Sequence, residues 1–260
     1  MAAARENALS NVQPLREELT ERELRVQLAA AYRIFHHFGW PELIYGHITV
    51  RVPGPEHHFL INPFGLMYHE VTASNLVKID LDGNIVEPSN YPVNPAGFII
   101  HSAIHGAAED AHCVMHTHTT AGMAVAAMEC GLRPVSFPAI MLHDRIAYHD
   151  FEGVATRLDE RERLAENLGD KKVMILRNHG LLSVGKTVAE AFAWLYTAER
   201  ACQVQVAAMQ SGTPLIEPSE AIQIQHANGI DEVNAEVGFG TRDFAALMRL
   251  MDDKDPSYRN

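Results

Sequence analysis

The chain has 260 residues, a formal net charge of −12 and 47 % hydrophobic residues, which fits one large or two small globular domains. The acidic balance argues against a nucleic-acid partner and offers no basic patch for a membrane surface. No apolar run approaches the about 20 residues of a membrane span, the first residues lack the apolar core of a secretion signal, and the odd number of cysteines, three, favours reduced thiols. We therefore expect a soluble, cytoplasmic protein.

The first part of the chain predicts a helix followed by short strands. Residues 1–18 look like a flexible polar arm, and Thr20 with Glu23 then forms a capping box in front of apolar residues at helical spacing. Gly39 is expected to end this helix, because glycine readily adopts the left-handed conformation of a helix C-terminus. The strands predicted by alternation are Tyr45–Val52, Phe59–Ile61 and a hairpin of Val77–Asp80 with Ile85–Val86.

Helices and strands alternate in the second part of the chain. Pro95 suits the first position of a helix that runs to about His105. A strand at Ala111–Met115 leads into a helix of small residues, Ala121–Met128, and the stretch from 134 to 153 is predicted to be irregular. The later helices are predicted after the caps Asp159 and Thr187, the second of them the longest at Val188–Gln210, and finally at Asp243–Met251.

This alternation favours one α/β domain with a mixed sheet at residues 19–215. Residues 216–260 are rich in proline and acidic side chains after Gly212, and we predict a C-terminal extension that contains one short helix. The chain shows no internal repeat and no low-complexity tract.

His116 and His118 form the most informative motif. In an extended segment they lie on the same face, about 7 Å apart along the strand. Two imidazoles so placed can bind one metal ion if a third ligand joins them, and His179, which follows the apolar strand Val173–Leu176, is the candidate. Because the chain has 15 histidines, about one such pair is expected by chance, so the pair alone is weak evidence.

Four segments have to be considered together. They are Tyr45-Gly46-His47-Ile48-Thr49-Val50-Arg51, Ile61-Asn62-Pro63-Phe64-Gly65, His116-Thr117-His118 and Asn178-His179-Gly180-Leu181. In this order and spacing they resemble the class II aldolase/adducin family, and in particular an adducin head-like subgroup that lacks the aldolase glutamate. The resemblance implies a three-layer α/β/α fold with a mixed, mostly antiparallel central sheet. It also implies a homotetramer with metal sites near its subunit interfaces.

The resemblance also implies a set of metal ligands. In family aldolases His116, His118 and His179 match the ligands of a divalent metal, most often zinc, with iron, manganese or cobalt as further possibilities. The family's acid/base glutamate, on the helix before the His-x-His strand, falls on Gly97, so its carboxylate is missing here.

The phosphate-binding segments of the family are altered as well. Its serine-rich segment falls on Pro95 and Ala96, the Ser-Gly of its second phosphate loop becomes Phe64-Gly65, and the usual asparagine of its Gly-Asn loop is His47. A sugar phosphate is therefore not the expected substrate. We expect a small non-phosphorylated hydroxy- or oxo-carboxylic acid.

A centre with three histidine ligands leaves coordination positions open, which is typical of a catalytic metal. Such a metal acts as a Lewis acid that stabilises an enolate, so we predict a lyase that performs aldol cleavage or decarboxylation. Proton transfer then needs another group, and histidine is readily poised near neutral pH. The candidates are His47, His143 and His149, with Tyr148 as a hydrogen-bond donor.

Other interpretations stay open at this point. His101 and His105 lie four residues apart on one predicted helix and could form a rival metal pair, although packing on a helix face is the simpler explanation. Some relatives of the family are non-haem iron oxygenases, and three neutral imidazoles suit iron(II) with an oxo-acid and O₂. A non-catalytic binding module is the third alternative. Adducin heads keep the fold but generally lose the metal histidines, which this chain retains.

Overall fold

The fold is built on a seven-stranded sheet in the order β3-β2-β1-β4-β7-β6-β5. A computed structural model describes residues 19–107, 110–153 and 160–260. Among these residues β5 and β6 run parallel and the other neighbouring strands run antiparallel, which confirms the mixed, mostly antiparallel sheet. The strands are β1 (Ile48–Arg51), β2 (Phe59–Ile61), β3 (Val77–Ile79), β4 (Cys113–Thr117), β5 (Ile146–His149), β6 (Val173–Leu176) and β7 (Gly180–Gly185).

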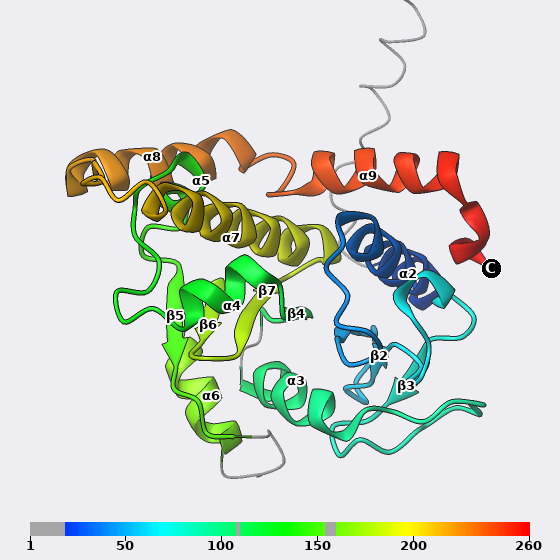
Figure 1. Cartoon of the computed structure of the whole chain (residues 1–260). Coiled ribbons are helices and arrows are strands. Elements are labelled where there is room, and N and C mark those ends of the chain that lie inside the picture. The colour runs from blue at the N-terminus through cyan, green and yellow to red at the C-terminus, as the bar shows by residue number, and fades with distance from the viewer. Residues whose placement is uncertain (1–18, 108–109, 154–159) are drawn as a thin grey trace, which may run out of the picture.

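Helices cover both faces of this sheet, so the three-layer α/β/α architecture is confirmed (Figure 1). Successive strand residues face opposite layers: Met115 packs with one helical layer, whereas Val114 packs with the other. One layer, the α7 layer, holds α2 (Glu21–Phe38), α4 (Thr120–Ala126) and α7 (Val188–Met209). The opposite layer, the α3/α6 layer, holds α3 (Pro95–Ala107) and α6 (Glu160–Leu168).

Capping residues place the ends of the two longest helices as predicted. Thr20 and Glu23 form the capping box of α2, and Gly39 ends that helix with a φ of 71°. The Thr187 hydroxyl accepts a hydrogen bond of 3.0 Å from the backbone N–H of Glu190 at the start of α7. These local bonds fix where each helix begins.

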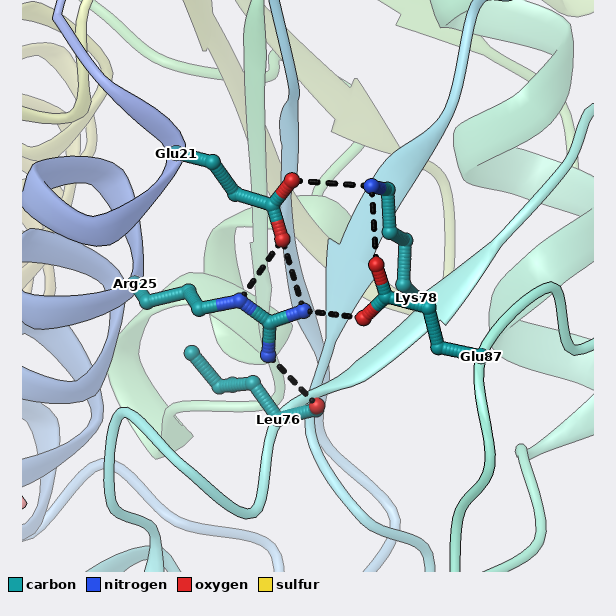
Figure 2. A network of polar contacts seen from close by, with 5 residues as sticks. All are labelled: Glu21, Arg25, Leu76, Lys78 and Glu87. Carbon is teal, nitrogen blue, oxygen red and sulfur yellow. Dashed lines mark hydrogen bonds and ion pairs between the residues drawn. The ribbon is translucent and has the colours of Figure 1, made fainter.

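A network of charged groups ties the start of α2 to the edge of the sheet (Figure 2). Lys78 on β3 lies 2.8 Å from a carboxylate oxygen of Glu21 and 3.0 Å from one of Glu87. The guanidinium of Arg25 lies 2.8 Å from the same two carboxylates and donates a hydrogen bond of 3.0 Å to the backbone oxygen of Leu76. Each charge in this network therefore has a partner of opposite sign.

Two regions differ from the sequence predictions. The stretch predicted to be irregular contains α5 (Phe137–Met141) and β5, and Ser136 caps α5 by accepting a hydrogen bond of 3.4 Å from the Ala139 N–H. The predicted arm 1–18 and the predicted cap Asp159 lie outside the described residues. The remaining short helices are η1 (Tyr68–Glu70) and η2 (Pro256–Arg259).

The second difference lies in the last part of the chain. One helix was predicted there, at residues 243–251, but the structure has two, α8 (Glu220–Asn234) and α9 (Thr241–Lys254). α9 packs on α2 and α7 and buries Phe244 and Met251, so it is part of the main core (Figure 1). The domain boundary at residue 215 stays a prediction. No helix of the described residues is long and apolar enough to cross a membrane.

Candidate metal centre

Three histidines converge at the end of β4, as the sequence predicted. His116 belongs to β4, His118 follows it, and His179 lies in the turn between β6 and β7. One ring nitrogen of each lies within 4.8 Å of the other two, and the Nε2 atoms of His116 and His118 are 2.7 Å apart. The ring centroids are 4.6 to 4.8 Å apart. The three side chains therefore surround one point, although their role as ligands stays a proposal.

The turn between β6 and β7 brings His179 to this point. Its backbone N–H donates to the Leu176 oxygen at 3.1 Å, and Asn178 adopts a φ of 56°, a left-handed conformation that asparagine tolerates better than most residues. At Gly180 a Cβ would lie only 2.3 Å from the backbone oxygen of Thr117. Glycine is thus required for the start of β7 to touch the end of β4.

The ring nitrogens of the trio are in the form that binds metals. His116 Nδ1 lies 2.8 Å from the backbone oxygen of Leu181, and because a carbonyl only accepts, Nδ1 carries the hydrogen and Nε2 is bare. Burial lowers the pKa of His116 well below its ordinary value, lowers the pKa of His118, and lowers the pKa of His179 to about 4. Neutral imidazoles fit zinc and similar divalent ions, and the ring of His116 is also anchored through Nδ1 on an acceptor.

His47 lies beside the trio and fills the space next to Gly97. Its ring centroid is 5.4 Å from that of His116, and its side chain is 5 % exposed. A Cβ at Gly97 would lie 2.8 Å from Cγ and Nδ1 of His47. The imidazole therefore occupies the space that any side chain at position 97 would enter. Burial lowers the pKa of His47 to about 4.

His101 and His105 do not form a metal pair. His105 Nδ1 donates to the backbone oxygen of Ala111 at 2.7 Å, so its bare Nε2 accepts the hydroxyl hydrogen of Thr49, also at 2.7 Å. The Thr49 oxygen in turn accepts from His101 Nδ1 at 2.6 Å. Both nitrogens of His105 are thus used in hydrogen bonds, and the pair is part of a buried network behind His47, whose ring centroid is 4.3 Å from that of His101.

The structure does not bring His143 and Tyr148 to the trio, in contrast to the sequence prediction. His143 Nδ1 lies 3.1 Å from the Gln223 side-chain oxygen on α8, in a surface groove. Tyr148 points to the α7 layer, where its hydroxyl accepts from the Leu132 N–H at 3.0 Å. The reason is strand alternation: within β5 it is His149 that faces the α3/α6 layer, on which the trio lies.

A buried carboxylate that the sequence did not reveal supports the junction after His118. Glu199 on α7 accepts a hydrogen bond from the Thr119 hydroxyl and another, of 2.8 Å, from the Gln203 amide. Burial raises the pKa of Glu199. The only signal in the sequence was an acidic residue within the small apolar stripe of the long helix, which does not point to a contact 80 residues away.

Comparison with known proteins gives consistent results. Residues 26–206 match the profile described as the Class II Aldolase and Adducin N-terminal domain. A protein of Caulobacter vibrioides is 47 % identical over 245 residues, which cover 92 % of each chain. Alpha-adducin of Mus musculus is 46 % identical over 246 residues, which cover 90 % of this chain but 33 % of the adducin.

Solved structures agree with these sequence matches. The crystal structure of an aldolase II superfamily protein from Pseudomonas syringae superposes with a TM-score of 0.87 at 47 % identity, covering 94 % of this chain and 98 % of that one. L-fuculose 1-phosphate aldolase from Glaciozyma antarctica PI12 superposes with a TM-score of 0.81 at 29 % identity, covering 96 % and 98 %.

Proposed function

The chain belongs to the class II aldolase and adducin family, and from this premise we propose that it is a divalent-metal-dependent lyase. The proposed reaction is aldol cleavage or decarboxylation of a small non-phosphorylated hydroxy- or oxo-carboxylic acid. The observation that carries the proposal is the convergence of three neutral imidazoles on one point. His116, His118 and His179 would hold the ion, with zinc as the first choice. When bound, the ion supplies Lewis acidity towards the oxygens of the substrate.

His47 is the proposed proton-transfer group. The family's acid/base glutamate is replaced by Gly97, and the His47 ring takes up the adjoining space. Its Nδ1 lies 3.3 Å from the backbone oxygen of Tyr45, which can only accept, so the ring hydrogen is on Nδ1. The bare Nε2 is buried and makes no hydrogen bond within the described part of the chain, so it is available beside the metal ligands. Proton transfer by a positioned group typically contributes 10²- to 10⁴-fold to a rate, roughly.

The test combines metal content with turnover. The purified protein, loaded with zinc, cobalt or iron(II), is assayed on a panel of hydroxy- and oxo-acids for carbonyl product, CO₂ and O₂ uptake. We expect cleavage or decarboxylation, and about a 100-fold lower kcat in His47→Asn with an unchanged metal content. His69→Asn, an exposed histidine outside the centre, serves as the control. O₂ uptake coupled to turnover would instead support the oxygenase interpretation.

The contact between His47 and Gly97 allows a sharper experiment. Gly97→Glu alone is expected to lower turnover, because its Cβ would lie 2.8 Å from the His47 ring. The double variant His47→Ala/Gly97→Glu removes the ring atoms that a Cβ at position 97 would meet and restores the family's carboxylate. If Gly97→Glu by itself raised turnover strongly, the chain would be a decayed aldolase and His47 would not be the proton-transfer group.

A non-catalytic binding module is the second candidate, because alpha-adducin is 46 % identical over 90 % of this chain. It would be supported by a fully metal-loaded protein that turns over no member of the panel. We also propose a homotetramer in the cytoplasm, as the family resemblance implies. Light scattering of the purified protein tests the oligomeric state.

A further inference from the structure

A second buried histidine lies on the other side of the trio from His47. His149 is 4 % exposed and ends β5, and the α6 residues Glu160 and Asn167 contact it. Its Nδ1 is 2.8 Å from the Asn167 amide nitrogen, and its Nε2 is 3.5 Å from a carboxylate oxygen of Glu160. The Glu160 side chain is itself buried, with 6 % of the residue exposed. None of these three residues has a role in the proposed reaction.

The parallel pairing of β5 and β6 explains why His149 lies near a metal ligand. His149 is opposite Leu176 in the register, and the carboxyl ends of parallel strands meet at one edge of a sheet. His179 follows β6 by three residues and therefore reaches the same edge. His149, Glu160 and His179 line one small cavity, with a volume of about 10 Å³, which is room for a single water molecule.

The hydrogen bonds fix the tautomer of His149. An amide N–H only donates, so the Asn167 amide leaves His149 Nδ1 bare and places the ring hydrogen on Nε2. This Nε2 is buried and has no hydrogen-bond partner among the described residues. His149 thus presents an N–H to the cavity, and Glu160 presents an acceptor.

His179 differs from His116 in what holds its outer nitrogen. The Nδ1 of His116 is anchored directly on the backbone oxygen of Leu181 at 2.8 Å, whereas no described residue hydrogen-bonds to the His179 ring. A histidine that binds a metal with one nitrogen carries a hydrogen on the other, and that N–H needs an acceptor. The carboxylate of Glu160, which lines the same cavity as His179, is such an acceptor.

We propose that His149 and Glu160 are the outer hydrogen-bond partners of His179 and set the affinity of the centre for its metal. One water molecule in the cavity would accept the N–H of His179 and the Nε2–H of His149 and donate to the Glu160 carboxylate. The buried Nε2–H of His149, which has no partner among the described residues, is then satisfied, and the water makes the three or so bonds usual for a buried water. The inference rests on the metal role proposed for the trio, but not on the reaction.

Zinc affinity of the purified full-length protein is the measurement, by competition with a chromophoric chelator. Outer partners of metal-bound histidines contribute roughly 10- to 100-fold to metal affinity, so we expect Glu160→Gln and His149→Gln each to weaken zinc binding by that factor. The matched control is Glu152→Gln. Glu152 lines the same cavity, but its carboxylate is bound to Arg163 at 2.7 Å and lies 3.9 Å from His149, so its variant should keep the wild-type affinity.

Thermal unfolding of the metal-free variants separates lost folding from lost affinity. A variant that unfolds with the wild-type midpoint but binds zinc more weakly supports the proposal. Should Glu160→Gln fail to fold, His149→Gln carries the test, because its amide can still bond to Asn167. Wild-type zinc affinity in both variants would overturn the proposal, as would a wild-type protein that binds no zinc. A protein that binds zinc but turns over no substrate would refute only the lyase.

Discussion

The two faces of the central sheet differ in the kinds of side chain that they bury. The face towards α7 is lined by apolar residues such as Ile48, Met115 and Ile175, which pack against small or aliphatic side chains of the helix. The face towards α3 and α6 combines an apolar cluster with buried polar side chains that belong to His101, His105, His116, His149 and Thr49. The first face carries the larger apolar cluster, and the second carries the buried histidines of the candidate centre.

The difference also concerns hydrogen bonding. Within the described chain, His47, His101 and His149 each have a buried Nε2 without a hydrogen-bond partner, and all three lie on the α3/α6 side near the trio. An unsatisfied buried polar group costs about 1 to 3 kcal/mol. Such groups are expected where a bound species completes the site, and we interpret their clustering in this way.

The largest expected effect is loss of the metal from the face towards α3 and α6, on which the three histidines lie. His118→Ala removes one of three converging donors, so the variant should purify with little metal and lose the proposed lyase activity. Metal analysis of wild type and variant checks this. Full metal content in His116→Ala, His118→Ala and His179→Ala alike would refute the proposed centre and remove the distinction between the two faces.

A truncation on the α7 face should act on stability instead. Leu195 is fully buried in the core, and Leu195→Ala is expected to lower the free energy of unfolding by about 2 to 5 kcal/mol. At a temperature where the variant stays folded, its zinc content should equal that of the wild type. Denaturant unfolding and metal analysis give both values, and a loss of zinc without a loss of stability would contradict the comparison.

Lowering the pH should lower the free energy of unfolding through the buried histidines on the side of α3 and α6. The pKa of His47 is about 4 in the folded chain and about 6.5 in an unfolded one. As pH falls from 6.5 towards 4, the unfolded state binds a proton that the folded state does not, so the free energy of unfolding falls, by roughly 3 kcal/mol for this residue. In the metal-free protein His47→Asn should flatten this part of the stability curve, and an equally steep curve in the variant would contradict the buried neutral state.

The smallest effect is expected at the ionic network of α2 and β3. Arg25→Gln removes the pairs with Glu21 and Glu87, but partly exposed ion pairs each contribute only about 1 kcal/mol or less. Denaturant unfolding at low and at high salt should show a difference from wild type that shrinks as salt screens the charges. A loss as large as that of Leu195→Ala would mean that the network is a main support of the fold.

The sequence predicted best where local signals are strong. The caps Thr20 and Thr187 and the periodicity behind them predicted α2 and α7 closely, and the run Val173–Leu176 matched β6. α8 was missed because its apolar residues, such as Ile222, Ile224 and Val233, are spread around the helix, and only Ala227 is buried. A helix with so little buried surface leaves a weak pattern in the sequence.

The residues of the candidate site were also predicted best where the sequence carries a strong local signal. The trio could be predicted because its spacing and its family resemblance agree, and the structure brings all three rings together. Tyr148 was misplaced because the stretch that contains β5 was predicted to be irregular, so alternation was not used to separate Tyr148 from His149. The contacts of His149 with Glu160 and of Thr119 with Glu199 depend on packing between distant elements, so no local pattern could reveal them.

The contact between Gly180 and the backbone of Thr117 has a consequence for the tolerance of the site to mutation. A Cβ at position 180 would lie 2.3 Å from that oxygen. The backbone at the start of β7 is therefore in direct contact with the backbone at the end of β4. The backbone contact between Gly180 and Thr117 therefore helps to set the spacing between His118 and His179. A single added methyl at position 180 would push the turn between β6 and β7 away from β4 and spread the rings apart, although all three histidines would still be present in the sequence.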